Sequence, residues 1–319
     1  MKIALISSTK DTASVNLKKR LLENYEFVET ELEFDNNAVY GYLSGKNDVK
    51  LYTIETPLIT RDDLDDEIDA DLFLFLSRHR AEGGRASLTV HPIGNFGEAL
   101  AGGKSRKLGI CHPEYFKRIL NELTENVKGT KYEATVESTH HGPFMDKPAL
   151  FVELGSNETF WEDKEGAKIV INSVMSAIEN NSDDKEDNPI EKRSNNKDNK
   201  DKNIIKNDFQ SNKNTNSKKI NKKNDDYENK AAFVIGGSHY SHIANKLLLN
   251  TEYSVSHICP KHKLADLDDE TLRQAMERSL PKTNFALLDW KGMGSEKQRV
   301  LELLENSKVK FERSDKFFK

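Results

Sequence analysis

The 319-residue sequence contains only two cysteines, Cys111 and Cys259, which lie far apart. Two distant thiols exclude a disulfide framework, and they leave no CxxC spacing for a metal or redox site. We expect each thiol to be a small buried apolar side chain. A reducing cytoplasm is therefore the simplest location for this protein.

Long hydrophobic runs are also missing from the sequence. No stretch approaches the roughly 18 consecutive apolar residues that a membrane span requires. Residues Met1–Ser7 lack the apolar region and cleavage site of a signal peptide, and they are typical of a first β-strand. The net charge of -5 gives no bulk attraction to DNA or to other polyphosphates, so any nucleic-acid contact must come from a local basic patch.

Apolar residues are scarcest in the segment Asn181–Asn229, which consists mainly of Asn, Lys, Asp, Glu and Ser. Such a composition cannot bury enough apolar surface to offset the entropy of ordering, so it predicts disorder. Positive and negative charges nearly balance in it, which favours a passive insertion over a nucleic-acid tether. We expect residues 1–180 and 230–319 to be two parts of a single α/β domain.

Short apolar runs alternate with helical patterns on both sides of this segment. Leu72–Leu76 is a continuous apolar run, typical of a strand buried on both faces. The alternation predicts an α/β fold, in which helices cover both faces of a mostly parallel sheet. Other predicted strands are Ile3–Ser7, Lys107–Ile110, Tyr132–Val136, Ala149–Leu154, Ala231–Ile235, Ser254–Ile258 and Phe285–Leu288. The predicted helices are Ser14–Asn24, Glu114–Leu123, Phe160–Glu179, His239–Leu249, Asp268–Arg278 and Ser295–Asn306, the last capped by its serine.

Histidines follow four of the predicted strands closely. Because the carboxyl ends of parallel strands meet at one edge of a sheet, we expect these side chains to share a polar site. Imidazole acts as a general acid or base near neutral pH and is a common zinc ligand. The four positions are His79, His112, the pair His140–His141, and His239.

The candidate metal ligands include a carboxylate as well as imidazoles. Glu153 ends a predicted strand and could bind a metal or orient an imidazole, although a buried structural carboxylate is an open alternative. His239 and His242 are three residues apart in the first turn of a predicted helix, so they would share one face. No HExxH motif supports zinc from spacing alone.

Two further motifs are typical of anion binding. Gly236-Gly237-Ser238 opens a predicted helix directly after a strand, so its backbone N–H groups could hold a phosphate or stabilise an oxyanion. A tight turn with a serine cap explains the same residues equally well. Arg78 and Arg80 flank His79 and suit a phosphate or an RNA 3′ end, although arginines are also common on solvated faces.

Taken in order along the chain, the motifs closely resemble those of the archaeal and plant type of D-aminoacyl-tRNA deacylase. The resemblance covers essentially the whole chain outside Asn181–Asn229, a tract that has no counterpart in the family pattern. The motifs that carry it are Ser77–Arg80, His91–Gly97, Cys111–Pro113, Thr139–Pro143, Glu153–Ser156, Gly236–Tyr240 and Lys291–Met293.

This resemblance implies a cytoplasmic, monomeric, zinc-dependent enzyme that hydrolyses the ester between a D-amino acid and the 3′-terminal ribose of tRNA. It also implies a fold related to phosphorylases and peptidyl-tRNA hydrolases. The expected catalytic residues are His140, His141, His239 and Thr139. The expected contacts with the tRNA 3′ end are Arg78, His79, Arg80, Gly236, Gly237 and Ser238. The expected zinc ligands are His140, Glu153, His239 and His242.

Two alternatives remain open on the sequence alone. One is another metal-dependent hydrolase, such as a peptidase or amidohydrolase, on a similar α/β scaffold. The other is a non-catalytic RNA-binding protein that uses Asn181–Asn229 as its main contact. The lack of an RNA-stacking aromatic motif disfavours the second alternative.

Overall fold

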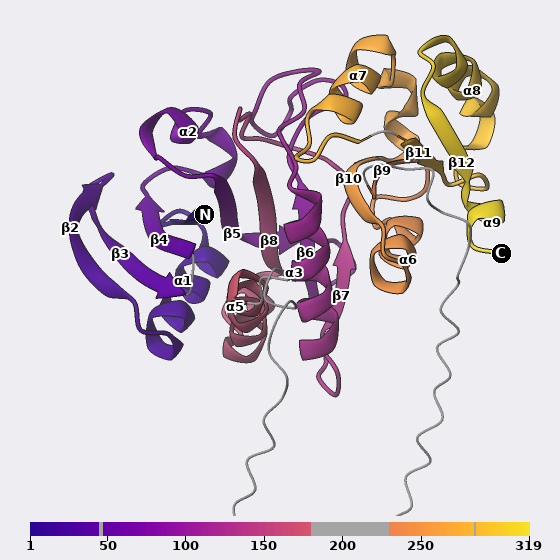
Figure 1. Ribbon diagram of the computed structural model, residues 1–319. Coiled ribbons are helices and arrows are strands. Elements are labelled where there is room, and N and C mark those ends of the chain that lie inside the picture. The colour runs from indigo at the N-terminus through magenta and orange to yellow at the C-terminus, as the bar shows by residue number, and fades with distance from the viewer. Residues whose placement is uncertain (45–46, 180–229, 284) are drawn as a thin grey trace, which may run out of the picture.

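The computed structural model describes residues 1–44, 47–179, 230–283 and 285–319, which form two β-sheets lying side by side (Figure 1). The large sheet has the strand order β2-β3-β4-β1-β5-β8-β6-β7, and the small sheet has the order β10-β9-β11-β12. The predicted insertion, residues 181–229, lies outside the described residues.

The bounds of the elements are as follows. The large sheet consists of β1 (Lys2–Ser8), β2 (Val28–Phe34), β3 (Asn37–Ser44), β4 (Asn47–Ile54), β5 (Leu72–Arg80), β6 (Ser87–Pro92), β7 (Glu133–Val136) and β8 (Ala149–Ser156). The small sheet consists of β9 (Ala231–Ile235), β10 (Ser254–Cys259), β11 (Phe285–Leu288) and β12 (Lys310–Arg313). The α-helices are α1 (Thr12–Asn24), α2 (Leu64–Glu67), α3 (Pro113–Asn126), α4 (Glu158–Trp161), α5 (Lys164–Glu179), α6 (His242–Asn250), α7 (Asp269–Glu277), α8 (Lys297–Asn306) and α9 (Ser314–Phe317). Short 3-10 helices are η1 (Leu58–Thr60), η3 (Lys261–Asp266) and η4 (Gly294–Glu296).

The pairing of the strands confirms the predicted α/β class. In the large sheet β4, β1, β5 and β8 run parallel, as do β6 and β7, whereas β6 is antiparallel to β8. The β2–β3 and β3–β4 pairs are antiparallel. All pairs in the small sheet are parallel. The parallel strands thus occupy the centre, where the helices that connect them cover them.

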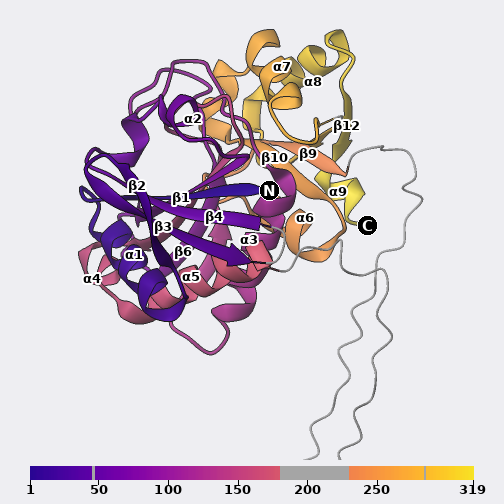
Figure 2. The same ribbon diagram turned by 60° about the vertical axis from the view of Figure 1, so that its left-hand side comes forward.

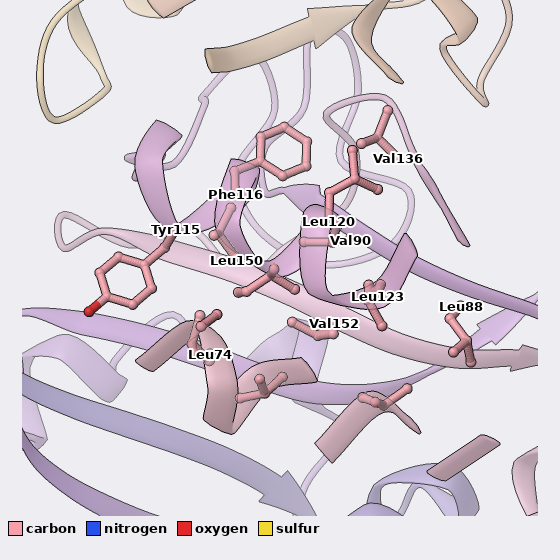
Figure 3. Close-up of a cluster of buried hydrophobic side chains, with 14 of the residues drawn as sticks. Leu74, Leu88, Val90, Tyr115, Phe116, Leu120, Leu123, Val136, Leu150 and Val152 are labelled. Atoms are coloured by element: carbon pink, nitrogen blue, oxygen red, sulfur yellow. The ribbon is translucent and has the colours of Figure 1, made fainter. Parts of the chain in front are cut away.

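One face of the large sheet carries the main hydrophobic core. Every residue of β8 is buried, as expected for a central strand between two covered faces. Leu150 and Val152 of β8 face α3, whose Phe116 and Leu120 project onto the sheet (Figure 3). Figure 1 shows α1, α5 and α3 together on this side of the sheet.

The opposite face of the large sheet is covered differently. Phe75 of β5 and Phe151 of β8 stack there with ring centroids 4.6 Å apart. They belong to a second core cluster with Leu64 of α2 and Leu58 of η1, so short elements and loops cover this face instead of long helices. This thinner cover leaves room for polar side chains, which is where the candidate site lies.

The two sheets share a hydrophobic core. The cluster that includes Phe116 of α3 also contains Val234 of β9, Val255 of β10 and Leu287 of β11. In the small sheet α6 lies on one side, and α7 and α8 lie on the other, as the second view shows from a different angle (Figure 2). This continuity supports our proposal that both parts of the chain form a single domain.

Several sequence-based boundaries need correction. Lys107–Ile110 is wrong as a strand, because Leu108 and Ile110 form only isolated bridges and the Leu108 N–H is bonded to the Gln274 side chain. Phe160–Glu179 is not one helix but α4 and α5. The expected cap at Ser295 is also wrong, because this serine lies inside η4 and makes no capping bond to α8. Among the described residues, no helix is long and apolar enough to cross a membrane.

We predict that the α3 contact with β8 is a main source of stability. Phe116→Ala leaves a cavity in this fully buried layer and should lower the free energy of unfolding by about 3–5 kcal/mol. Urea denaturation measures the change. Leu100→Ala is the control, because Leu100 is 86% exposed and should change stability little. Equal losses in both variants would contradict the assignment of the core.

Candidate functional site

A cavity of about 390 Å³ lies over the polar part of the β5–β8 face. Glu153 of β8 follows Phe151 by two residues, so both side chains project to the same face. His79 of β5 projects to that face too, since its neighbour in register is Gly155. A Cβ on Gly155 would come within 2.6 Å of the His79 Cβ, so this glycine provides the space that His79 occupies. The sequence indicated a site in the loops after the strands. In the structure, part of the site lies on the strands themselves.

Two buried carboxylates surround His79. Its Nδ1 lies 3.0 Å from Glu137 Oε1 and 3.5 Å from Glu153 Oε2. Glu137 follows β7 directly and is 1% exposed, and Glu153 is 4% exposed. On the other side of the ring, His79 Nε2 is 2.8 Å from the Tyr240 hydroxyl. The imidazole thus links β5 to both carboxylates and to the loop after β9.

Three further histidines are held in the same tautomer by backbone carbonyl groups. His91 Nδ1 is 3.1 Å from Pro92 O, His140 Nδ1 is 2.8 Å from Ser138 O, and His141 Nδ1 is 2.7 Å from Gly142 O. A carbonyl oxygen can only accept, so each Nδ1 must carry the proton. Each Nε2 is then left with a free lone pair, which is the form in which imidazole binds metals.

The ligand atoms of His91, His140 and His141 lie within 4.8 Å of one another. Glu153 Oε1 lies 3.7 Å from His91 Nε2 and 4.0 Å from His141 Nε2. A tetrahedral zinc site with bonds near 2.0–2.1 Å needs ligand atoms roughly 3.3 Å apart, so a small contraction would suffice. His91 Nε2 is buried and has no hydrogen-bond partner, which is a cost that a bound cation would remove. These residues therefore fit a zinc ion.

A second possible metal group shares His140 with the first. It consists of Glu137, His140 and His239, and a third group joins His79 to the two carboxylates. His239 Nε2 is 2.7 Å from Glu137 Oε2, and its Nδ1 is 2.8 Å from the Ser138 hydroxyl. The order Ser138–His239–Glu137 is similar to that of a serine-hydrolase triad. However, Ser138 is fully buried, so its hydroxyl cannot reach an ester, and we assign it to orienting His239.

The pKa shifts follow from burial and from the carboxylates. Burial lowers the pKa of His79, but Glu137 and Glu153 outweigh it and raise the pKa to about 10. Burial raises the pKa of Glu137, but hydrogen bonds with His239 and His79 hold it well below its usual range. The site therefore contains ionised carboxylates compensated by a charged imidazole.

The pKa shifts of the three carbonyl-bonded histidines differ from one another. Burial lowers the pKa of His141 to about 4 and, with the nearby imidazoles, holds the pKa of His140 well below its usual range. Burial also lowers the pKa of His91, but the Glu153 carboxylate outweighs it, so this pKa is raised. A proton and a metal ion would thus compete for His91 Nε2.

Cationic side chains lie at the mouth of the cavity. Arg78 and Arg80 both line it, and their guanidinium groups lie 5.4 Å and 4.9 Å from the centre of the Trp161 ring. The Trp161 indole N–H in turn donates to His79 O at 2.8 Å. Asp11, the N-cap of α1, accepts the Arg78 backbone N–H at 3.1 Å. The arginines are thus anchored next to the histidines, where the sequence placed them.

Several of the expected site residues lie outside the cavity. The Thr139 hydroxyl accepts the Ile258 N–H at 3.0 Å and contacts His257 Nδ1 at 3.2 Å, so it holds the loop against β10. His242 is exposed, and among the described residues it joins no metal group. His239 and His242 do not share a helical turn, because α6 begins at His242 after the Ser241 cap. His112 precedes α3 and also lies away from the cavity.

The role expected for the Gly236–Ser238 backbone also needs correction. These residues do not open a helix, and both glycines adopt positive φ values of 101° and 85°. The Gly236 N–H donates to Cys259 O at 2.8 Å, and the Gly237 N–H donates to Gly292 O at 3.2 Å. These two N–H groups are therefore unavailable to an oxyanion. Gly237 and Ser238 line a separate groove.

Glu137 and His91 are the site residues that the sequence analysis did not assign. Glu137 lies between the predicted strand and the Thr139–Pro143 motif, and nothing in its spacing marks it as buried. His91 lies within β6, where its ring stacks on Phe151 at 5.4 Å. The glycine-bearing motif His91–Gly97, which begins at this histidine, was the one available signal.

We predict that His257 makes the protein sensitive to acid. Its Nε2–H donates to Arg278 O at 2.9 Å, and burial lowers the pKa of His257 to about 4. The unfolded chain, with a histidine pKa near 6.5, takes up this proton first, so stability is lost as pH falls from 6.5 towards 4. The contribution lost between pH 7 and pH 5 is about 2 kcal/mol. His257→Gln should lose correspondingly less stability over this range in urea denaturation, whereas the exposed control His242→Gln should behave like the wild type. An unchanged pH dependence in His257→Gln would contradict the assignment.

Comparisons with known proteins show the family to which this chain belongs. The sequence profile for D-aminoacyl-tRNA deacylase matches residues 66–312. The D-aminoacyl-tRNA deacylase of Methanosarcina acetivorans is 32% identical over 321 residues, covering 97% of this chain and 91% of the relative. That of Thermococcus kodakarensis is 30% identical over 310 residues, covering 94% of each.

A solved structure has a similar fold. The crystal structure of a conserved protein of unknown function is 28% identical, has a TM-score of 0.74, and covers 99% of this chain and 96% of that one. The profile and the relatives confirm the family resemblance that the order of the motifs along the chain had indicated. The chain belongs to the D-aminoacyl-tRNA deacylase family.

Proposed function

We propose that this protein is a zinc-dependent hydrolase that cleaves the ester between a D-amino acid and the 3′-terminal ribose of tRNA. The observation that carries the proposal is the group of three imidazoles with carbonyl-bonded Nδ1 atoms, His91, His140 and His141, beside the Glu153 carboxylate. Membership of the deacylase family supports the choice of substrate. We expect a cytoplasmic monomer.

We expect the site residues to have different roles in the reaction. A zinc ion held by His91, His140 and His141 would polarise the ester carbonyl and promote ionisation of a water molecule. His239 reaches the cavity, and its side chain is 34% exposed. The Glu137 carboxylate, 2.7 Å from His239 Nε2, accepts a hydrogen bond from this imidazole and orients it in the cavity. Glu153 is placed to orient the imidazoles or to complete the ligand set.

The mouth of the cavity favours a polyanionic substrate over a free peptide. Arg78 and Arg80 lie together over Trp161, and Lys10 lines the same cavity. Guanidinium groups pair well with phosphate oxygens, which are present along an RNA strand and absent from simple peptides. This distinguishes the proposal from a peptidase on the same scaffold.

A deacylation assay on matched D- and L-tyrosyl-tRNA tests the proposal. We expect the purified protein to release D-tyrosine much faster than L-tyrosine, to lose this activity in a chelator, and to regain it with zinc. Short peptides with D-residues serve as the competing substrates. Lack of D-tyrosyl-tRNA hydrolysis by zinc-loaded protein, or faster turnover of the peptides, would overturn the proposal.

Zinc binding can be tested independently of activity. His91→Ala and His140→Ala each remove one Nε2 lone pair and should weaken zinc affinity by at least about tenfold in competition with a chromophoric chelator. His242→Ala is the matched control, because this exposed histidine belongs to no metal group in the described part of the chain. A loss of affinity in His242→Ala equal to that in His91→Ala would contradict the assigned ligands.

A further inference from the structure

The small sheet has a groove of its own at the carboxyl ends of its strands. Strands β10, β9 and β11 are adjacent and parallel, so the loops after them meet at one edge. These loops line a groove of about 570 Å³ with Gly237, Ser238, Lys261, His262, Asp289 and Gly292. Crevices at such edges are the usual ligand sites of parallel sheets, and this volume is within the range of small-molecule sites.

Glycines bring the floor of the groove close to a carboxylate. A Cβ on Gly237 would lie 2.7 Å from Asp289 Oδ2, and a Cβ on Gly292 would lie 2.6 Å from the same atom. Asp289 Oδ1 accepts the Gly292 N–H at 3.0 Å, and no described residue donates a hydrogen bond to Oδ2. Asp289 lines the groove, and its Oδ2 is held there as a free acceptor.

Two backbone N–H groups of these loops are already hydrogen-bonded. The Gly237 carbonyl accepts the Lys261 N–H at 2.8 Å, and the Gly237 N–H donates to Gly292 O. An anion in the groove would consequently be bound by side chains and not by these N–H groups. Lys261 is exposed at its rim and lies against Gly294, where a Cβ would be 2.8 Å from Lys261 Cε. The groove thus combines the Asp289 carboxylate, which can accept a hydrogen bond from a hydroxyl group, with the cationic side chain of Lys261.

The groove adjoins the metal cavity through consecutive residues. Ser238 lines the groove and His239 lines the cavity. Because these residues are consecutive, their Cα atoms are only about 3.8 Å apart. The His239 carbonyl accepts the Ser138 N–H at 2.8 Å, which fixes this connection to the loop that carries His140. A ligand in the groove is therefore next to the metal site.

We infer that this groove binds a nucleotide of the tRNA acceptor end. In this arrangement a ribose 2′-hydroxyl donates to Asp289 Oδ2, and a phosphate pairs with Lys261. A carboxylate accepting from ribose at a glycine-rich sheet edge is the chemistry that parallel sheets use for nucleotides. A 2′-hydroxyl contact also distinguishes RNA from DNA. The inference rests on the proposed function, and it adds a site for the RNA strand outside the metal cavity.

The test measures binding of the trinucleotide cytidine–cytidine–adenosine, the sequence that ends every tRNA, by fluorescence polarisation of a 5′-labelled probe. The wild type should bind the ribose form about tenfold more tightly than the 2′-deoxy form. Asp289→Asn keeps an oxygen for the Gly292 N–H but loses the charged acceptor, so most of this preference should disappear. Lys261→Met should weaken both forms and reduce the salt dependence by about 0.7 in log–log slope. Lys168→Met, an exposed lysine on α5, is the control.

Failure of this inference differs from failure of the proposed function. If deacylation proceeds but the trinucleotide binds equally well to the wild type and both groove variants, or does not bind to the wild type, the groove assignment is wrong. If the variants weaken binding as expected while no D-tyrosyl-tRNA is hydrolysed, the groove stands and the proposed function fails. Where both hold, Asp289→Asn and Lys261→Met should raise KM for D-tyrosyl-tRNA with little change in kcat.

Discussion

Two buried carboxylates, Glu137 and Glu153, impose the strongest electrostatic constraint on this structure. An ionised carboxylate away from water is unfavourable unless positive charge and hydrogen bonds compensate it. His79 lies between them and supplies charge to both, and His239 donates to Glu137. The remaining imidazoles are fixed by carbonyl groups with their Nε2 lone pairs free. A divalent cation would complete the compensation, which is why we propose that a metal binds at this position and not at the exposed His242.

The fold explains how these groups come together from distant parts of the chain. His79, His91 and Glu153 lie on adjacent strands of the large sheet, on the face that η1, α2 and loops cover. Glu137 and His140 belong to the loop after β7. His239 arrives from the small sheet, and its carbonyl accepts the Ser138 N–H. The contact between the two sheets is therefore also the place where the site is assembled.

Much of the central fold could be predicted, because continuous apolar runs specify buried strands. Ala231–Ile235 and Phe285–Leu288 match β9 and β11 residue for residue. Strands β2, β3, β4, β6 and β12 were not predicted. In β2 glutamates alternate with Val, Thr, Leu and Phe, which is a strand pattern, but this strand lies at the sheet edge and is largely exposed, so no buried apolar run marks it. Lys107–Ile110 has the composition of a strand, but its N–H groups are bonded outside a ladder, which only the tertiary structure determines.

The candidate site was predictable in its motifs but not in its roles. Histidine-rich motifs indicated a polar site. The Arg78–Arg80 segment lies beside this site, as the sequence predicted. Glu137 gave no signal, because a single glutamate after a strand is normally solvated and its burial depends on His79 and His239. Thr139 and Gly236 were assigned to chemistry, yet their polar groups stabilise loops. Sequence spacing cannot tell whether a hydroxyl or an N–H is already bonded to a neighbouring strand.

The central claim is that His91, His140 and His141 hold a metal ion through Nε2. Anomalous diffraction at the zinc absorption edge, from crystals grown with zinc, tests it most directly. The account predicts a peak about 2.0–2.1 Å from Nε2 of these three histidines, next to the Glu153 carboxylate. A cavity without an anomalous peak, or zinc bound only at exposed histidines such as His242, would contradict it.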